Sequence, residues 1–415
     1  MPLTSAALSS EFHRLPPRAA VGAVRPSPAC VADRNGVTLE YAIVSTRADF
    51  DALATEWDAL FAHSGRGPQI FQSFGWCWHW CNHFLVANRT SLAIVTGRRA
   101  GRLVLVWPMV KERSAGLTVL SSLGAPVGQY SDALIEPSPE AQEQLLGAWE
   151  SVVAAVKPDL VCMPRVRADA AIAPLMVQLG AMATRQLEAP YIDLAGAGDF
   201  DSYMRRHSVH SRKKFRAAAR RLAGLGDVNF VEKAQSTAAA QLAADALDMK
   251  RRQLIERGLL SPAFTNRRLW DFFTDAARGG RHPTGVSIHA LQVGGESAAA
   301  NILLANKDCM LGHVFAYESR YAKDSAGAQL LQHTFKRAME EGYRTFDLLA
   351  PADDYKMRCA DGTVSVIDWA VPLTIRGNAY TRLYLKLARP LLKHCMERLP
   401  AAASRFLAQR YYDRS

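Results

Sequence analysis

Apolar and polar positions alternate in short blocks along most of the chain, and the clearest succession of blocks runs from residue 298 to residue 356. Two apolar runs, 298–304 and 309–316, flank a polar turn at 306–308, and this pattern predicts a β-hairpin. Downstream, apolar residues recur at the spacing of one helix face, at positions 330, 331, 334, 335 and 338. A further strand is predicted at 345–349, so we expect a hairpin, a helix and a strand in that order.

The same two periodicities divide the remainder of the chain into predicted strands and helices. Strands are predicted at 37–44, 91–95, 102–110, 131–135, 160–163, 191–194, 228–231, 286–292 and 364–371. Helices are predicted at 46–62, 77–85, 141–156, 170–179, 201–225, 237–257 and 266–277. Because strands alternate with helices, the chain is expected to be an α/β protein with a mixed sheet.

The two ends of the chain lack this alternation. Residues 1–36 are rich in Pro, Ala, Ser and Arg without a periodic pattern, so we expect a disordered N-terminal arm. Residues 377–415 mix apolar residues with Arg and Lys, and this basic amphipathic tail either packs on the protein or lies on a membrane surface. The 415-residue chain has room for two domains, which we expect at 37–190 and 191–376.

The start of the helix near residue 325 is a candidate anion site. Asp324 or Ser325 can cap this helix, and the small residues Ala326 and Gly327 leave its first N–H groups accessible. These N–H groups and the helix dipole suit a pyrophosphate or a phosphopantetheine phosphate. Lys356, just beyond the next strand, can add a positive charge to the same area. In the structural alternative, Gly327 only permits close packing and Lys356 is solvated.

This segment resembles the core of the CelD/BioF-like acetyltransferase domain, a relative of the FemAB peptidyltransferases with the GNAT fold. The resemblance rests on four motifs, namely Tyr317-Glu318-Ser319-Arg320-Tyr321-Ala322, Ser325-Ala326-Gly327, Gly342-Tyr343-Arg344-Thr345-Phe346-Asp347 and Tyr355-Lys356. Ala326 stands where the family usually has Pro, and Glu318 stands where it usually has Asp. The resemblance covers residues 37 to 376 and is most specific from 298 to 356.

The resemblance implies two tandem GNAT-like halves, of which only the second has the helix start of residues 325–327. It also implies an acyltransferase that moves an acyl group, such as acetyl, from a CoA or acyl-carrier-protein thioester to an amine or hydroxyl. The acceptor would be a small molecule or a glycan, for example in polysaccharide or cell-envelope biosynthesis. Transfer of this type is usually a direct attack on the thioester, so no cysteine nucleophile is needed.

The resemblance also suggests roles for individual residues. Backbone N–H groups of Ser325, Ala326 and Gly327 would hold the donor phosphates, and Tyr355 would line the cleft. Lys356 would bind a phosphate or the oxyanion. Glu318 or Asp347 would act as the base or would orient the acceptor. Tyr317 would donate a proton to the leaving thiolate. For Asp347, on a predicted strand, a structural role fits equally well.

The charge balance favours anionic partners. The formal net charge is +11. The most basic stretch, 205–221, is predicted to be an amphipathic helix. This helix binds RNA, a membrane surface or an acidic carrier, or it is simply a solvated surface. The seven cysteines are scattered, and no apolar run approaches the ~20 residues of a membrane span. We therefore expect a cytoplasmic protein, either free or peripheral to the inner face of the membrane.

Two further classes stay open, whereas a metal site is not expected. In the helix predicted at 77–85, Cys77 and Cys81 share a face, but His79 projects roughly opposite, so these residues do not predict a zinc site together with His83. Motifs of ATPases, dinucleotide enzymes, zincins and α/β-hydrolases are absent from the sequence. The alternatives are a FemAB-type aminoacyl-tRNA-dependent peptidyltransferase and a non-catalytic scaffold of an exopolysaccharide machine. A nucleic acid partner, namely tRNA, is expected only for the peptidyltransferase.

Overall fold

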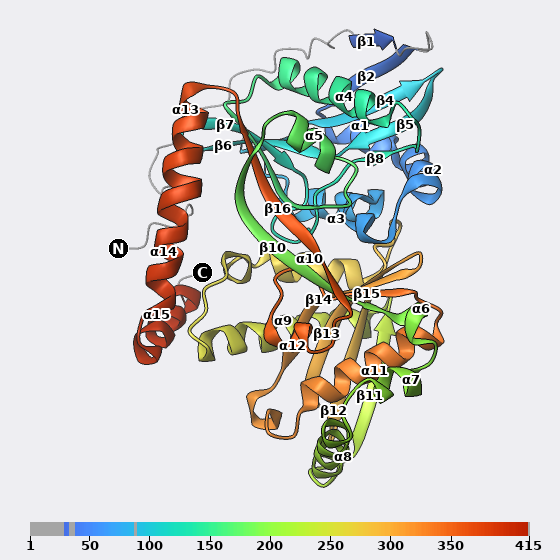
Figure 1. Ribbon diagram of the computed structural model, residues 1–415, viewed down its shortest axis with the longest axis vertical. Coiled ribbons are helices and arrows are strands. Elements are labelled where there is room, and N and C mark those ends of the chain that lie inside the picture. Colours follow the sequence, from blue (N-terminus) through green and yellow to red (C-terminus); the bar gives the residue numbers. More distant parts are fainter. Residues whose placement is uncertain (1–28, 33–37, 87–88, 414–415) are drawn as a thin grey trace.

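Two long antiparallel strands, β10 (Met182–Asp193) and β16 (Gly362–Pro372), run through the middle of the molecule and connect its two α/β halves (Figure 1). The structure is a computed structural model and describes residues 29–32, 38–86 and 89–413. The first 28 residues of the expected N-terminal arm, and residues 33–37, lie outside the described residues. Residues 29–32 of that segment form strand β1, which pairs with β2.

The first half contains a five-stranded sheet, in the order β1-β2-β4-β5-β8, and part of a larger sheet. Its strands are β1 (Ala29–Ala32), β2 (Thr38–Val44), β3 (Thr90–Leu92), β4 (Ile94–Arg99), β5 (Arg102–Trp107), β6 (Met109–Ser114), β7 (Leu117–Ser122), β8 (Leu134–Ile135) and β9 (Leu160–Arg167). Its helices are α1 (Arg47–Ala52), α2 (Ala54–Ser64), η1 (Gly67–Gln72), α3 (Phe74–Phe84), α4 (Ala141–Val156) and α5 (Ala173–Gln178).

The second half places its helices on both faces of the remaining strands (Figure 1). Its strands are β11 (Val228–Ala234), β12 (Val286–Val293), β13 (Glu296–Asn306), β14 (Cys309–Tyr317) and β15 (Thr345–Asp347). Its helices are α6 (Leu194–Ala197), α7 (Phe200–Arg205), α8 (Val209–Ala223), α9 (Thr237–Glu256), η2 (Pro262–Thr265), α10 (Arg268–Arg278), η3 (Ser319–Tyr321), α11 (Ala326–Glu340) and α12 (Asp354–Met357).

The larger sheet crosses from one half to the other. Its eleven strands follow the order β11-β12-β13-β14-β15-β10-β16-β9-β7-β6-β3. Strand β10 pairs with β16 along most of its length, and its last residues, 191–193, pair with β15 of the second half. Strand β16 in turn pairs with β9 of the first half. The final predicted strand, at 364–371, is therefore confirmed, and it links both halves rather than closing one of them.

Among the described strands, β7 pairs in parallel with β9 in the first half, and β14 pairs in parallel with β15 in the second. Parallel neighbours need a long crossover connection, which α4 supplies in the first half and α11 in the second. The β14–β15 pairing is short, because only residues 309–311 of β14 face residues 345–347 of β15. Strand β15 ends at Asp347, so the last six residues of β14 have no strand partner on that side, which leaves a gap beside them.

Local sequence explains where several helices begin. Helix α3 begins after Ser73, whose hydroxyl accepts a hydrogen bond from the Trp76 N–H. The helix predicted at 201–225 is divided into α7 and α8, because Ser208 adopts a non-helical conformation and caps α8 through the Ser211 N–H. The helix predicted at 46–62 is likewise divided in two at Leu53.

An aromatic cluster packs the two halves against each other. The Trp76 ring from α3 lies 4.9 Å from the Phe272 ring of α10, centroid to centroid, in an edge-to-face arrangement. Phe71 and Phe273 extend the cluster, and all four side chains are almost completely buried. Such edge-to-face pairs add to the stabilisation from burial alone, so the interface between the halves has the character of a core.

The C-terminal segment forms a long helical column along both halves (Figure 1). It consists of α13 (Ile375–Ala379), the π-helical segment η4 (Tyr380–Ala388), α14 (Arg389–Glu397) and α15 (Ala401–Asp413). Helix α15 packs on the second half, where the Tyr412 hydroxyl accepts a hydrogen bond from the Ser261 N–H and donates one to the Leu259 carbonyl. Within the described part of the chain, no helix is both long enough and apolar enough to span a membrane.

Candidate active site

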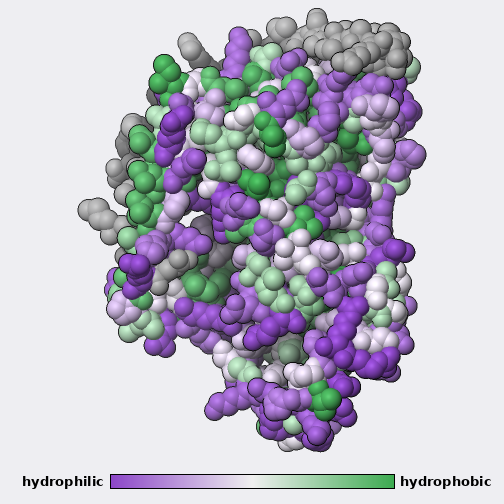
Figure 2. Space-filling model, in the orientation of Figure 1, coloured by the Kyte–Doolittle hydropathy of each residue, from purple (hydrophilic) through white to green (hydrophobic). Residues whose placement is uncertain are grey.

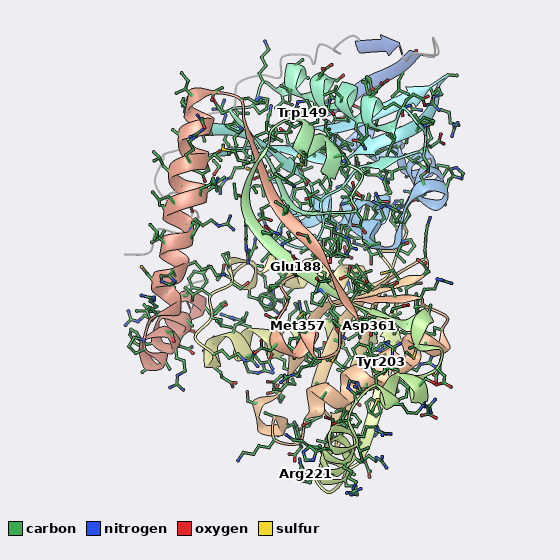
Figure 3. All side chains as sticks on the ribbon, in the orientation of Figure 1. Trp149, Glu188, Tyr203, Arg221, Met357 and Asp361 are labelled. Atoms are coloured by element: carbon green, nitrogen blue, oxygen red, sulfur yellow. The ribbon has the colours of Figure 1, made fainter. Side chains whose placement is uncertain are left out.

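A cleft of about 1140 Å³ lies in the second half, between α8, α9, the end of β14, the start of α11 and the segment that contains α12. We call it the α9–α11 cleft. Its lining includes Lys214, Phe215, Lys250, Gln253, Arg257, Phe315, Tyr317, Ser325, Ala326, Gly327, Asp353, Asp354, Tyr355 and Arg358. In Figure 3, Met357 marks the α12 side of this region and Arg221 marks the C-terminal end of α8. The cleft is large enough for a cofactor-sized ligand.

The gap between β14 and β15 forms one wall of the cleft. Phe315 and Tyr317 project from the part of β14 that extends beyond the end of β15. The Phe315 ring lies 5.7 Å from the Tyr355 ring, so the two aromatic side chains close the wall together. Burial raises the pKa of Tyr355, which therefore stays protonated at neutral pH.

The start of α11 presents its backbone to the cleft. Ser325 adopts a left-handed conformation with φ of 56°, and its side chain makes no capping hydrogen bond. The first helical hydrogen bond runs from the Gln329 N–H to the Ser325 carbonyl, so the N–H groups of residues 326–328 have no acceptor within the helix. A Cβ atom on Gly327 would lie 2.8 Å from Cζ of Phe315, so a side chain at 327 would require the Phe315 ring to move.

Positive charges outnumber negative charges in the lining. The cations are Lys214, Lys250, Arg257 and Arg358, and the carboxylates are Asp353 and Asp354. The Lys250 ammonium donates a hydrogen bond of 3.1 Å to the Phe315 carbonyl, and burial lowers its pKa. The excess of positive charge and the free N–H groups of α11 favour an anionic ligand.

Tyr317 and Glu318 are neighbours in sequence but lie in different surroundings. The Tyr317 hydroxyl faces the cleft and accepts a hydrogen bond of 2.8 Å from the Arg257 guanidinium. The Glu318 carboxylate does not line the cleft and instead pairs with the Arg252 guanidinium at 2.5 Å. Side chains alternate along an extended backbone, which accounts for the different directions.

Lys356 is buried beside the cleft and does not line it. Its ammonium donates hydrogen bonds of 2.8 and 2.9 Å to the carbonyls of Leu349 and Pro351. Burial lowers the pKa of Lys356 to about 8. In this arrangement the side chain fixes the loop that carries Tyr355, and it is not directed at the start of α11.

Asp347 lies at the junction of the two halves, also outside the cleft lining. Its carboxylate accepts hydrogen bonds from the Tyr130 hydroxyl at 2.9 and 3.0 Å and from the Arg167 guanidinium at 2.7 Å. Burial raises the pKa of Asp347, and the positive charge of Arg167 opposes that rise. Because Tyr130 and Arg167 belong to the first half, this network ties the end of β15 to the opposite half.

The structure thus brings together five of the eight predicted site residues. Tyr317, Tyr355 and residues 325–327 all line the cleft, whereas Glu318, Asp347 and Lys356 have partners elsewhere. Sequence reasoning missed Lys250 and Arg257, because the predicted helix at 237–257 did not reveal which of its basic residues would face β14. Lys214 belongs to the basic stretch at 205–221.

Helix α8 carries that basic stretch at one end of the molecule (Figure 1). Ala218 and Leu222 are buried against the domain, while Lys213, Lys214, Arg216 and Arg220 are exposed. Arg221 pairs with Asp324, directly before the start of α11, at 3.2 Å. The basic helix is therefore part of the domain and extends from the rim of the cleft into solvent.

Comparisons with known proteins agree with this geometry. Residues 210–357 match the model of the Acetyltransferase (GNAT) domain, and this stretch includes every lining residue named above except Arg358. No curated protein matches the chain. The chain spans nearly the full length of the solved structures described next.

One similar solved structure is described as FemX, with 11% identity, a TM-score of 0.54, and coverage of 80% of this chain and 98% of that one. A second is a conserved protein of unknown function from Bacteroides thetaiotaomicron VPI-5482, with 13% identity, a TM-score of 0.50, and coverage of 79% and 99%. At such identities the likeness shows the fold alone. The expected fold class, a mixed α/β protein with two tandem GNAT-like halves, is confirmed.

Proposed function

We propose that this protein is an acyltransferase that binds an acyl-CoA or carrier-protein thioester in the α9–α11 cleft and transfers the acyl group, such as acetyl, to an amine or hydroxyl. One observation carries the proposal. The unpaired start of α11, the gap beside β14 and an excess of cations meet in one cleft. No other described part of the chain combines an anion site with an opening that admits an extended chain.

In this proposal the donor phosphates bind the N–H groups of residues 326–328, and Lys214 and Arg358 neutralise their charge. The pantetheine arm lies along the unpaired edge of β14, where its amides meet backbone groups. Lys356 and Asp347 act as positioning residues, because each fixes a segment that borders the cleft rather than touching the ligand.

The chemical step is a direct attack. The acceptor nitrogen or oxygen attacks the thioester carbonyl carbon, the carbon–sulfur bond breaks, and the thiolate takes a proton from the Tyr317 hydroxyl. The Arg257 guanidinium donates a hydrogen bond of 2.8 Å to that hydroxyl and holds it in position. Glu318 is the proposed base for the acceptor, and it can reach the cleft only by leaving Arg252.

Turnover of acetyl-CoA by the Tyr317→Phe variant tests this step. Loss of a positioned proton donor is expected to lower kcat by about 100-fold or more while donor affinity changes little. Tyr321→Phe is the matched control, because Tyr321 is buried outside the cleft lining four residues further on. Wild-type kcat in both Tyr317→Phe and Glu318→Gln would reject these assignments.

A second candidate function is aminoacyl-tRNA-dependent peptidyl transfer, which the basic helix α8 at the cleft rim favours. Binding of charged tRNA with a steep dependence on salt, together with no binding of acyl-CoA, would replace the proposal above with this one. A protein that binds neither donor and hydrolyses no thioester would instead fit a non-catalytic scaffold.

For the acyltransferase, the proposed acceptor is a small molecule or a glycan.

A further inference from the structure

Two histidines of α3 and one aspartate of α10 converge on a single point between the halves. His79 and His83 are four residues apart and share one face of α3. Nδ1 of His79 and Nε2 of His83 each lie 3.0 Å from the same oxygen, Oδ2 of Asp275. All three ligand-type atoms lie within 4.8 Å of one another.

The surroundings of His79 suit a metal-bound imidazole. Its Nε2 lies 3.1 Å from the His282 carbonyl, so both ring nitrogens face an acceptor oxygen. A neutral imidazole carries one N–H and can donate to only one of these acceptors, whereas an imidazolium donates from both nitrogens. A metal ion bound at Nδ1 also satisfies both nitrogens, because the neutral ring then donates from Nε2 to the carbonyl, as metal-bound histidines usually do.

We propose that His79, His83 and Asp275 bind one divalent transition-metal ion of the zinc class. Two imidazole nitrogens and one carboxylate oxygen are ligands that zinc accepts, whereas magnesium and calcium prefer oxygen alone. Ligands about 2.0 Å from a tetrahedral ion lie about 3.3 Å apart, close to the 3.0 Å separations in the structure. The Asp275 side chain is 35% exposed, so solvent reaches the fourth position.

The ion has a structural role in this proposal. Helix α3 belongs to the first half and α10 to the second, so the ion cross-links the halves beside the Trp76–Phe272 contact. None of the three ligands lines the α9–α11 cleft, and the inference is therefore independent of the proposed reaction. The two cysteines of the same helix are not ligands, because both are buried on another face and Cys77 Sγ is directed at the Phe71 carbonyl.

Zinc titration of chelator-treated protein without a histidine tag tests the proposal. Calorimetry should detect one equivalent of bound Zn²⁺, and thermal unfolding should shift upward with Zn²⁺ but not with Mg²⁺. Asp275→Asn and His83→Gln should each weaken binding at least tenfold and abolish the thermal shift. His210→Gln, at an exposed histidine of α8, should change neither result.

Circular dichroism of the metal-free variants establishes that they are folded. Asp275→Asn is nearly isosteric at a partly exposed position, so its fold should be retained even if a His79 variant fails to fold. Two results would overturn the proposal. The first is a folded wild-type protein that binds no Zn²⁺, which would leave the three residues as a hydrogen-bonded clamp. The second is stoichiometric binding that persists in both ligand variants.

Discussion

At the scale of single residues, the main difference from expectation concerns Lys356. Its position just after a strand suggested an exposed charge near the start of α11, yet its ammonium is bound by the carbonyls of Leu349 and Pro351. A buried ammonium is destabilised relative to its neutral form, which is why its pKa falls from 10.5 to about 8. Lys356 therefore holds the loop at Leu349 and Pro351, and its contribution to the free energy of unfolding depends on pH.

The stability difference between wild type and Lys356→Met should therefore change with pH. The unfolded chain keeps Lys356 protonated up to about pH 10.5, whereas the folded protein loses this proton near pH 8. Between these values the unfolded state binds more protons, so the free energy of unfolding contributed by Lys356 rises with pH, by about 3 kcal/mol at most. Urea unfolding of both proteins at pH 7.5 and 10.5 measures the change.

In that comparison wild type should gain stability over Lys356→Met at the higher pH. Other titrating groups are common to both proteins and cancel in the difference. Parallel stability curves across the whole range would show that the folded-state pKa of Lys356 is not lowered.

The sequence could predict residues whose role depends on their neighbours along the chain. Residues 325–327 reach the cleft because a small-residue helix start exposes backbone wherever it lies. Asp347 and Glu318 could not be placed in the same way, since their partners Arg167 and Arg252 are distant in sequence. Likewise, His79 and His83 did not predict a metal site from the sequence, because Asp275 lies 192 residues beyond His83.

At the scale of elements, the C-terminal column packs on the protein over only part of its length. Helix α15 packs on the second half through Tyr412, whereas η4 and α14 expose leucines. Leu383, Leu387 and Leu391 recur every four residues and are each more than half exposed. Figure 2 shows this column as a line of hydrophobic surface patches with hydrophilic patches beside it.

We predict that this face contacts anionic membranes. Exposed Arg382, Lys386 and Arg389 accompany the leucines, and an apolar stripe flanked by cations is typical of helices that lie at a membrane surface. In vesicle co-sedimentation, Leu383→Glu, Leu387→Glu and Leu391→Glu combined should weaken binding to anionic vesicles at least tenfold.

Val177→Glu is the charge-matched control for the single variant Leu387→Glu, because it places one negative charge on an exposed apolar residue of α5. It should bind vesicles as wild type does, and neutral vesicles should bind both proteins more weakly. Equal binding by the triple variant and wild type would contradict a membrane role for this face.

At the scale of the whole molecule, β10, β16 and the Asp347 network make the two halves one unit. We predict that Asp347→Asn lowers the free energy of unfolding by about 3 kcal/mol, because Arg167 would lose its buried carboxylate partner. The change is measured by urea unfolding. Glu296→Gln removes the carboxylate of the exposed Arg320–Glu296 pair and should cost less than about 1 kcal/mol. Equal effects of the two substitutions on the free energy of unfolding would contradict a stabilising role for the Asp347 network.

Much of this architecture could be expected from local patterns, but the way the halves join could not. The hairpin at 298–316 and the helix that follows are predicted because their periodicity is strong. Strand β7 and the first part of β10 were missed, and only residues 191–194 of β10 were assigned to a strand. The crossing of β10 and β16 depends on pairing between residues about 180 positions apart, which no local pattern encodes.

The most direct test of the central claim is calorimetric titration of acetyl-CoA into wild type and Gly327→Val. The account predicts one binding site in wild type and at least a tenfold loss in the variant, because a side chain at 327 would meet Phe315 and Tyr317 and fill the start of the cleft. Circular dichroism must show the variant folded. If wild type binds no acyl-CoA, or if folded Gly327→Val binds it equally well, the α9–α11 cleft is not the donor site.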